Sequence, residues 1–239
     1  MGIESVDILI QRAQVLRGRN IGQSIALLED ALSIAQQIDY KKGIALVIRD
    51  KAACAFVQKH YKRALTGYSE ALQFFKDLDD KDGQLSCLTE LGSIYFKLGE
   101  VPSALTYILE TLKINTERGD SEGIALGYNE IGKLHIYLQE YPQAIDYFKK
   151  ALKIFEGIKN KKEMVNSFFL LGNAYNWMDD LDKALYYLLR AVNSLEHLED
   201  ADARVKTLGS LAILHTKLKE YDKALSYFNK ALEIAHEGA

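Results

Sequence analysis

The sequence predicts an all-α chain, an α-solenoid of about six helix-turn-helix repeats that occupy residues 1–239 as a single array. Three observations lead to this prediction: a 40-residue period, apolar residues at helical spacing, and turn residues at fixed places in each period. The clearest mark of the period is an alanine near the start of each second helix, with a serine in the first repeat: Ser24, Ala64, Ala104, Ala144, Ala184 and Ala224.

One period shows why each repeat should contain two antiparallel helices. Apolar residues recur at helical spacing from Leu85 to Leu98, and Gly99 then interrupts the pattern. Pro102 suits the first turn of the next helix, where its missing N–H leaves no hydrogen bond unmade. Asp120 or Ser121 can cap the helix that follows. The small residues Gly92 and Ala104 are expected where the two helices approach closely.

The same pattern fixes the remaining repeats in order. Their expected bounds are approximately 4–40, 44–80, 84–120, 124–160, 164–200 and 204–237. The first is the most divergent, because Gln11 and Arg12 stand where the third repeat has a leucine and a glycine. The last keeps the pattern except for Ala212 and His215. Divergence at the ends is typical of repeat arrays.

The repeat resembles the tetratricopeptide repeat family over about residues 7–236. The matching positions are Leu88, Leu91, Gly92, Tyr95, Ala104 and Ile108 in one repeat, and Phe168, Leu171, Gly172, Tyr175, Ala184, Leu188 and Ala191 in another. The resemblance implies a right-handed solenoid that binds a partner protein or peptide in its concave groove. The long period is similar to that of spindle-orientation adaptors, kinesin light chains, Rap-type bacterial regulators and the sensory arms of some bacterial kinases and nucleotide cyclases.

In that family the groove is lined by the first helix of each repeat, on the side away from the second helix. Asparagine amides there can pair with a peptide main chain, since each offers both a donor and an acceptor. Basic side chains can hold a carboxylate, and aromatic side chains provide rigid apolar anchors. The peptide-binding residues implied by the resemblance are Arg49, Thr89, Phe96, Asn129, Lys133, Tyr137, Asn166, Asn173, Asn176 and Trp177.

Composition and motifs argue against other classes of function. The formal net charge is −3, from 30 basic and 33 acidic residues, so no electrostatic case for nucleic acid arises. No stretch approaches the roughly 20 apolar residues that cross a bilayer. No nucleophile, base and orienting group form a catalytic set, so we expect no enzyme activity, no metal and no cofactor. Cys54 and Cys87 are expected as small buried residues, and a cytoplasmic location follows.

Two alternatives stay open at this point. The chain could be the sensory or regulatory input arm of a larger bacterial signalling protein, such as a kinase, a phosphatase or a nucleotide cyclase, acting by docking or dimerisation. The terminal helices could also mediate self-association, because the helix over residues 221–236 is apolar and no polar capping helix follows it. The identity of the partner does not follow from the sequence.

Overall fold

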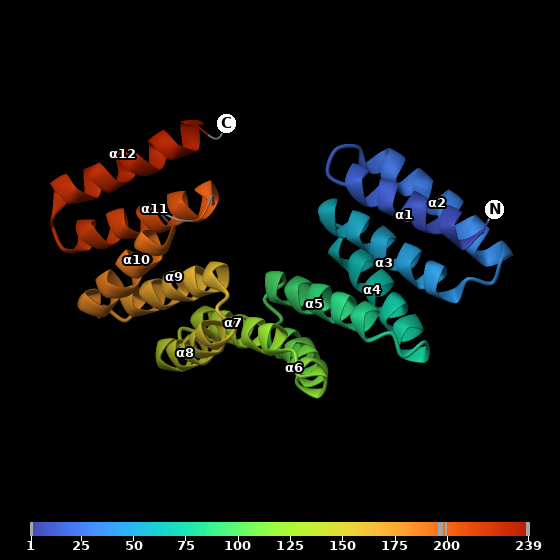
Figure 1. Ribbon diagram of the computed structural model, residues 1–239, viewed down its shortest axis with the longest axis horizontal. Coiled ribbons are helices and arrows are strands. Elements are labelled where there is room, and N and C mark those ends of the chain that lie inside the picture. Colours follow the sequence, from blue (N-terminus) through green and yellow to red (C-terminus); the bar gives the residue numbers. More distant parts are fainter. Residues whose placement is uncertain (1, 196–197, 199, 238–239) are drawn as a thin grey trace. The chain divides into compact units, whose positions relative to one another are not determined.

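The computed structural model describes residues 2–195, 198 and 200–237, and within them every regular element is an α-helix (Figure 1). This confirms the predicted all-α fold of paired helices. The twelve helices are α1 (Ile3–Leu16), α2 (Ile21–Gln37), α3 (Lys41–Val57), α4 (Tyr61–Asp77), α5 (Lys81–Lys97), α6 (Val101–Arg118), α7 (Ser121–Tyr137), α8 (Tyr141–Gly157), α9 (Lys161–Trp177), α10 (Leu181–Leu195), α11 (Ala201–Lys217) and α12 (Tyr221–Glu237).

Contacts divide the chain into two compact units, and the boundary falls inside α6. Unit 1 is Met1–Ile114 and unit 2 is Asn115–Ala239. In unit 1 the pairs α1–α2 and α3–α4 stack on one another, and α5 packs on α4. In unit 2 the pairs α7–α8, α9–α10 and α11–α12 stack in the same way. Whether all six repeats form one array with the expected bounds stays a prediction.

A left-handed residue ends most of the helices and recurs every 20 residues. Asp39, Lys59 and Asp79 have φ angles of 52°, 61° and 50°, and Gly99 and Gly119 continue the series. After α4, the N–H of Asp80 donates to the carbonyl of Phe75 at 2.9 Å and that of Asp79 to Lys76 at 3.1 Å. This bonding satisfies carbonyls that a helix end leaves without partners. Short turns of one geometry therefore set the period.

Side-chain caps start four of the first helices and two of the second helices in the described chain. The Oδ1 atom of Asp120 accepts from the N–H of Gly123 at 3.0 Å, which confirms the expected cap of α7. The same bond to the N–H three residues ahead is made by Asn20, Asp80, Asn160, Asp180 and Asp200. Asp and Asn are preferred at this position because the side-chain oxygen satisfies an N–H that the helix leaves unpaired.

The core of unit 1 lies between stacked pairs. Tyr68, Phe75 and Leu88 are fully buried there. Cys54 and Cys87 are buried free thiols, as expected from the sequence. Burial raises the pKa of the Cys87 thiol to about 12 because a thiolate loses its hydration in an apolar interior.

The first repeat keeps the packing of the others with a shifted register. Gln11 and Arg12 are exposed, whereas Ala13 is fully buried and its carbonyl accepts a hydrogen bond from the Ser24 hydroxyl at 2.7 Å. Ala13 therefore occupies the small position that the 40-residue alignment assigns to Arg12. Equivalent residues of α1 and α3 lie 39 positions apart, which explains why this repeat departs from the sequence pattern.

The core of unit 2 contains Phe148, Phe168, Leu171 and Leu188, all buried. Beside it, aromatic rings of the two helices in each pair stack on one another: His135 on Tyr147, Tyr175 on Tyr187, and His215 on Tyr227. Both histidines take the tyrosine position of the repeat, and the Nδ1 atoms lie 2.7 and 2.6 Å from the carboxylates of Glu140 and Glu220. They serve as packing residues.

On the first helices α7 and α9, the close approach to the paired second helix depends on glycine. A Cβ atom on Gly132 would lie 2.4 Å from Cε1 of Phe148, and one on Gly172 would lie 2.6 Å from Cγ of Leu188. At Gly92 the nearest atom, Cγ1 of Ile108, is 3.5 Å away, which is an ordinary contact. The expected close approach thus requires glycine at 132 and 172, whereas α5 and α6 leave room for a methyl group at 92.

Candidate functional site

Unit 1 contains a cavity of about 400 Å³ on the face that its first helices, α1, α3 and α5, present. Charged and polar side chains dominate its lining, and the apolar part comes from α3. The lining residues are Gln14, Arg17, Arg49, Asp50, Ala53, Phe56, Val57, Tyr68, Ser86 and Glu90. Consecutive first helices therefore supply donors, acceptors and apolar surface to one space.

A buried carboxylate organises this cavity. Asp50 is only 4% exposed, and its Oδ2 accepts from Nε2 of Gln14 at 2.8 Å and from Nη2 of Arg49 at 3.2 Å. Nη1 of Arg17 lies 3.5 Å from Oδ1. These contacts satisfy a charge that would otherwise be costly to bury. They also fix the two guanidinium groups at the cavity wall, because each is held by the same carboxylate.

Glu90 is the second acid of the cavity, and it forms no hydrogen bond or ion pair with the residues that the structure describes. Burial raises the pKa of its carboxyl, and Arg17 and Lys97 partly oppose that rise. Burial also raises the pKa of the nearby Tyr68 hydroxyl. The cavity thus offers an acceptor at Glu90 opposite guanidinium donors, and it can pair with both the N–H and the C=O groups of a ligand.

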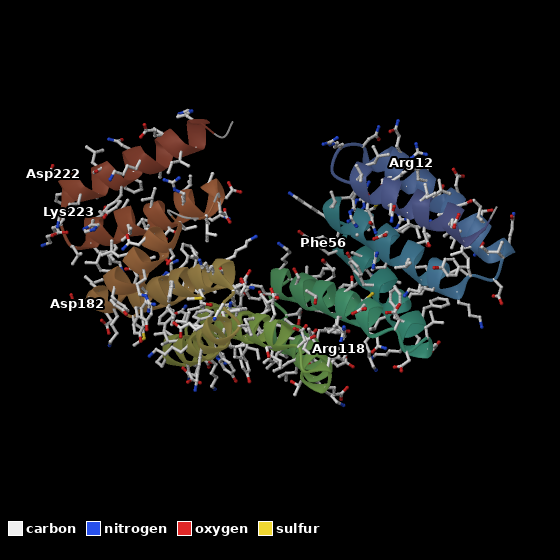
Figure 2. The ribbon with its side chains drawn as sticks, in the orientation of Figure 1. Arg12, Phe56, Arg118, Asp182, Asp222 and Lys223 are labelled. Atoms are coloured by element: carbon white, nitrogen blue, oxygen red, sulfur yellow. The ribbon has the colours of Figure 1, made fainter. Side chains whose placement is uncertain are left out.

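An aromatic wall borders the polar groups. Phe56, labelled near the end of α3 in Figure 2, lies with its ring centroid 5.9 Å from that of Tyr61. The Nζ atom of Lys97 lies 5.8 Å from the centre of the Phe56 ring, within range of a cation–π interaction. Val57 beside it is exposed. A ligand in the cavity would meet apolar surface on this side.

Of the predicted peptide-binding residues in unit 1, the structure brings Arg49 into this cavity. Ala53, Phe56 and Val57, on the same side of α3, line it as well. Thr89 is exposed and Phe96 is half-buried on α5, and neither lines the cavity. Their role in binding stays a prediction.

A second cavity, of about 590 Å³, lies in unit 2 between α9 and α11. The predicted Asn166 lines it together with Phe169 and Lys206. The Nδ2 atom of Asn166 donates to Oε2 of Glu163 at 3.1 Å, which orients the amide. Asn166 is therefore accessible from a hollow on the same kind of face as the cavity of unit 1.

Two of the other predicted asparagines, Asn129 and Asn176, are much less accessible than expected of groove residues. Asn129 is 1% exposed, and neither atom of its amide finds a hydrogen-bond partner among the described residues. Asn176 is also buried, with its Oδ1 unpaired in that same part of the chain. Nδ2 of Asn173 donates to the carbonyl of Phe169 at 3.1 Å, so one donor of this amide is already used. A ligand would reach Asn129 and Asn176 only after neighbouring side chains moved.

The remaining predicted residues of unit 2 lie at the surface. Nζ of Lys133 pairs with Oε1 of Glu130 at 2.6 Å, and this pair is accessible to solvent. Tyr137 and Trp177 are exposed. The Trp177 ring stacks on Tyr141 at 6.3 Å between centroids. Both aromatic side chains lie at the surface at the ends of α7 and α9.

Sequence reasoning missed Gln14, Arg17, Asp50 and Glu90. A signal for two of them exists, since acidic residues recur at 40-residue spacing as Asp50, Glu90 and Glu130. No spacing marks Gln14 and Arg17, which reach the cavity through the shifted register of α1. Among the described residues, no group of three His, Cys, Asp or Glu side chains could hold a metal ion.

Comparison with known proteins places the chain in a family. A tetratricopeptide repeat family model matches residues 83–157 and 163–237, which together exceed half of the chain. No curated protein sequence matches significantly. No helix of the described chain is long and apolar enough to span a membrane.

Solved structures share the fold at low sequence identity. BtubC (BKLC) from P. vanneervenii is 21% identical, with a TM-score of 0.77 over 91% of this chain and 92% of that one. A STAND signal-transduction ATPase with a tetratricopeptide repeat sensor from Pyrococcus horikoshii is 18% identical, with a TM-score of 0.82 over 98% of this chain and 37% of that one. A Rap protein complexed with competence and sporulation factor is 17% identical, with a TM-score of 0.69 over 99% and 76%. Paired helices, repeat pattern and family match agree, and the chain belongs to the tetratricopeptide repeat family.

Proposed function

We propose that the chain is a non-enzymatic protein-interaction module that holds an extended segment of a partner peptide or protein on the face formed by its first helices. The observation that carries the proposal is the cavity of unit 1, where three first helices contribute to one lining. Family membership supports a protein partner, because tetratricopeptide repeats are an interaction fold.

The chemistry of the cavity favours an extended main chain as the ligand. An extended peptide presents N–H and C=O groups that need partners at short intervals. Glu90 supplies an acceptor, and the guanidinium groups of Arg17 and Arg49 supply donors beyond those used by Asp50. Phe56 and Val57 can accommodate an apolar side chain of the same segment. In unit 2, Asn166, Lys133 and Trp177 would form a separate set of contacts with a partner.

A selection from a library of random displayed peptides tests the proposal and needs no identified partner. Peptides selected on the wild-type protein are titrated against Arg49→Ala and Phe56→Ala, with Lys62→Ala on α4 as the matched control. We expect each test variant to lose at least about fivefold in affinity, since an anchoring contact in a buried pocket contributes about 1 kcal/mol or more. Circular dichroism checks that both variants remain folded.

Two results would contradict this proposal. Selected peptides could bind both test variants as tightly as the wild type, which would place their site elsewhere. Alternatively, Lys62→Ala could weaken binding as much as Arg49→Ala, which would show that the loss is not specific to the cavity.

A second candidate function is that of a sensory or regulatory arm in a larger signalling protein. The observation that favours it is the STAND protein, in which a fold matching 98% of this chain makes up 37% of the whole and carries the sensor. The native polypeptide, probed by immunoblot in its source cells, should then be considerably larger than 27.0 kDa and contain a further domain. A native polypeptide of 27.0 kDa would exclude this candidate.

A cytoplasmic location belongs to the same proposal. Cys54 and Cys87 are free thiols in neighbouring repeats, which suits a reducing compartment. The absence of enzyme activity is also part of it: the charged cluster of unit 1 contains no nucleophile paired with a base, and its groups act by holding a ligand.

A further inference from the structure

The second helix of the last pair, α12, carries an apolar stripe on its surface. Leu225, Phe228 and Leu232 are 60%, 46% and 57% exposed. They lie three and four residues apart, so they share one face of the helix. Three large side chains on one face form a continuous apolar surface, in contrast to the scattered apolar residues of an ordinary surface.

The equivalent stripe earlier in unit 2 shows what covers such a surface. On α8 the equivalent residues, 80 positions earlier, are Ile145, Phe148 and Leu152, and all three are buried. They belong to one cluster with Val165 and Phe168 of α9, the first helix of the next pair. In this fold the stripe on a second helix is therefore the seat of a following first helix.

The opposite end of the chain carries the complementary surface. On α1, Ile8 and Val15 are 54% and 68% exposed. The residues 39 positions later on α3 are Val47 and Cys54, both buried in a cluster with residues of α1 and α2. The Cys54 sulfur lies 3.6 Å from the Ser24 hydroxyl on α2. These are the positions by which a first helix packs onto the preceding pair.

The same positions are buried in the first helices that have a preceding pair in their own unit. On α5 they are Cys87 and Ile94, and on α11 they are Thr207 and Leu214. Ile8 and Val15 are thus side chains of an interface type that lack a covering helix in the described part of this chain. Within residues 2–237 as described, no first helix covers Leu225, Phe228 and Leu232.

From this reciprocity we infer that copies of the chain associate head to tail, with α1 of one copy seated on α11 and α12 of the next. The junction repeats the packing of α3 on α1 and α2, and of α9 on α8, that the chain already uses internally. Charged side chains border both stripes: Arg12 follows Ile8 by four residues on α1, and Asp222 precedes Leu225 by three residues on α12 (Figure 2). A polar rim around an apolar centre is typical of protein interfaces.

This inference gives a direction to the self-association expected from the sequence. The two surfaces differ, so the contact is heterologous: each copy uses its α1 surface toward one neighbour and its α12 surface toward another. Heterologous contacts produce rings or open filaments, whereas a contact between two α12 helices would produce a closed dimer. The distinction can be measured directly.

Sedimentation-velocity and light-scattering measurements on the full chain test it. The average mass of the wild type should rise above 27.0 kDa with increasing concentration and pass twice that value. Val15→Lys at the α1 end, and Phe228→Lys or Leu225→Lys at the α12 end, should each be a monomer when alone. An equimolar mixture of Val15→Lys and Phe228→Lys should form a dimer of twice 27.0 kDa and nothing larger, because only one intact pair of ends remains.

The test has a control substitution and two results that would overturn the inference. Tyr186→Lys on α10 changes an exposed residue away from both stripes and should associate as the wild type does. A wild-type chain that remains a monomer at several hundred micromolar overturns the inference. So does a Val15→Lys variant that still dimerises while Phe228→Lys does not, since this pattern requires an α12–α12 contact.

Discussion

Glycine at one position of the repeat provides the sharpest test of the packing, because the same substitution should have opposite effects in two repeats. Gly92 and Gly172 occupy equivalent places on α5 and α9. A Cβ atom at 92 would lie 3.5 Å from its nearest neighbour, whereas at 172 it would lie 2.6 Å from Cγ and 2.8 Å from Cδ2 of Leu188. Leu188 is fully buried, so its side chain cannot move out into solvent.

The magnitudes follow from these distances. Replacing glycine by alanine inside a helix stabilises it by about 0.5–1 kcal/mol, and Gly92→Ala should gain this amount. At Gly172 the overpacking costs about 1–3 kcal/mol, so the net change should be a loss of up to about 2 kcal/mol. For a chain of this size each kcal/mol shifts the melting temperature by about 2–4 °C.

Thermal and urea unfolding followed by far-ultraviolet circular dichroism measure these changes. Gly209→Ala is the control for helix propensity alone, because nothing lies within 4 Å of its added Cβ. Gly92→Ala should match this control, and Gly172→Ala should melt below the wild type. The packing argument is refuted if Gly172→Ala stabilises the protein as much as the control does, or if Gly92→Ala destabilises it.

Three further predictions concern single residues. Burial raises the pKa of Glu90 above its usual 4.5. The carboxyl therefore holds a proton more tightly in the folded protein than in the unfolded chain. The free energy of unfolding falls as pH rises through the folded pKa. The Glu90→Gln variant should therefore have a higher melting temperature than the wild type at about pH 8, and the two should melt together below about pH 4.5. A difference in melting temperature that stays constant across this pH range would contradict a raised pKa at Glu90. Lys59→Gly should raise the free energy of unfolding, measured in urea, by about 1 kcal/mol, because the φ of 61° at this turn is strained for lysine. As a control, Lys62→Gly inside α4 should lower the free energy of unfolding by about 1 kcal/mol. Asp120→Ala should lose about 1 kcal/mol in the same assay with the cap to Gly123, and Asp120→Asn should retain it.

The regular part of this fold could be predicted from the sequence because each feature of the repeat acts over short distances. Helix ends, caps and apolar faces depend on residues within a few positions, and they recur at the period. The cap at Asp120 and the burial of the two cysteines could be predicted from such local features. The space for a methyl group at Gly92 could not be predicted in this way, because it depends on how Ile108 packs from the facing helix.

The candidate site was harder to predict than the fold. Arg49 was expected on the outer face of α3, where it lines the cavity, but its position depends on Asp50, an acid that the pattern alone treats as a surface residue. Arg17 joins the cluster through the shifted register of α1, which no local rule signals. Asn129 shows the opposite case, a residue of suitable chemistry that is buried. Its amide suits a peptide ligand, but its burial results from neighbouring helices that the sequence pattern does not place in detail.

The two buried cysteines give the molecule its own probes of local opening. A labelling reagent attacks the thiolate, and at about pH 8 the Cys87 side chain is both covered and, with a pKa of about 12, protonated. It reacts only during the moments when its helices separate. Cys54 is covered in the neighbouring repeat, so labelling rates at the two thiols would report separately, in the unmodified chain, how often adjacent repeats open.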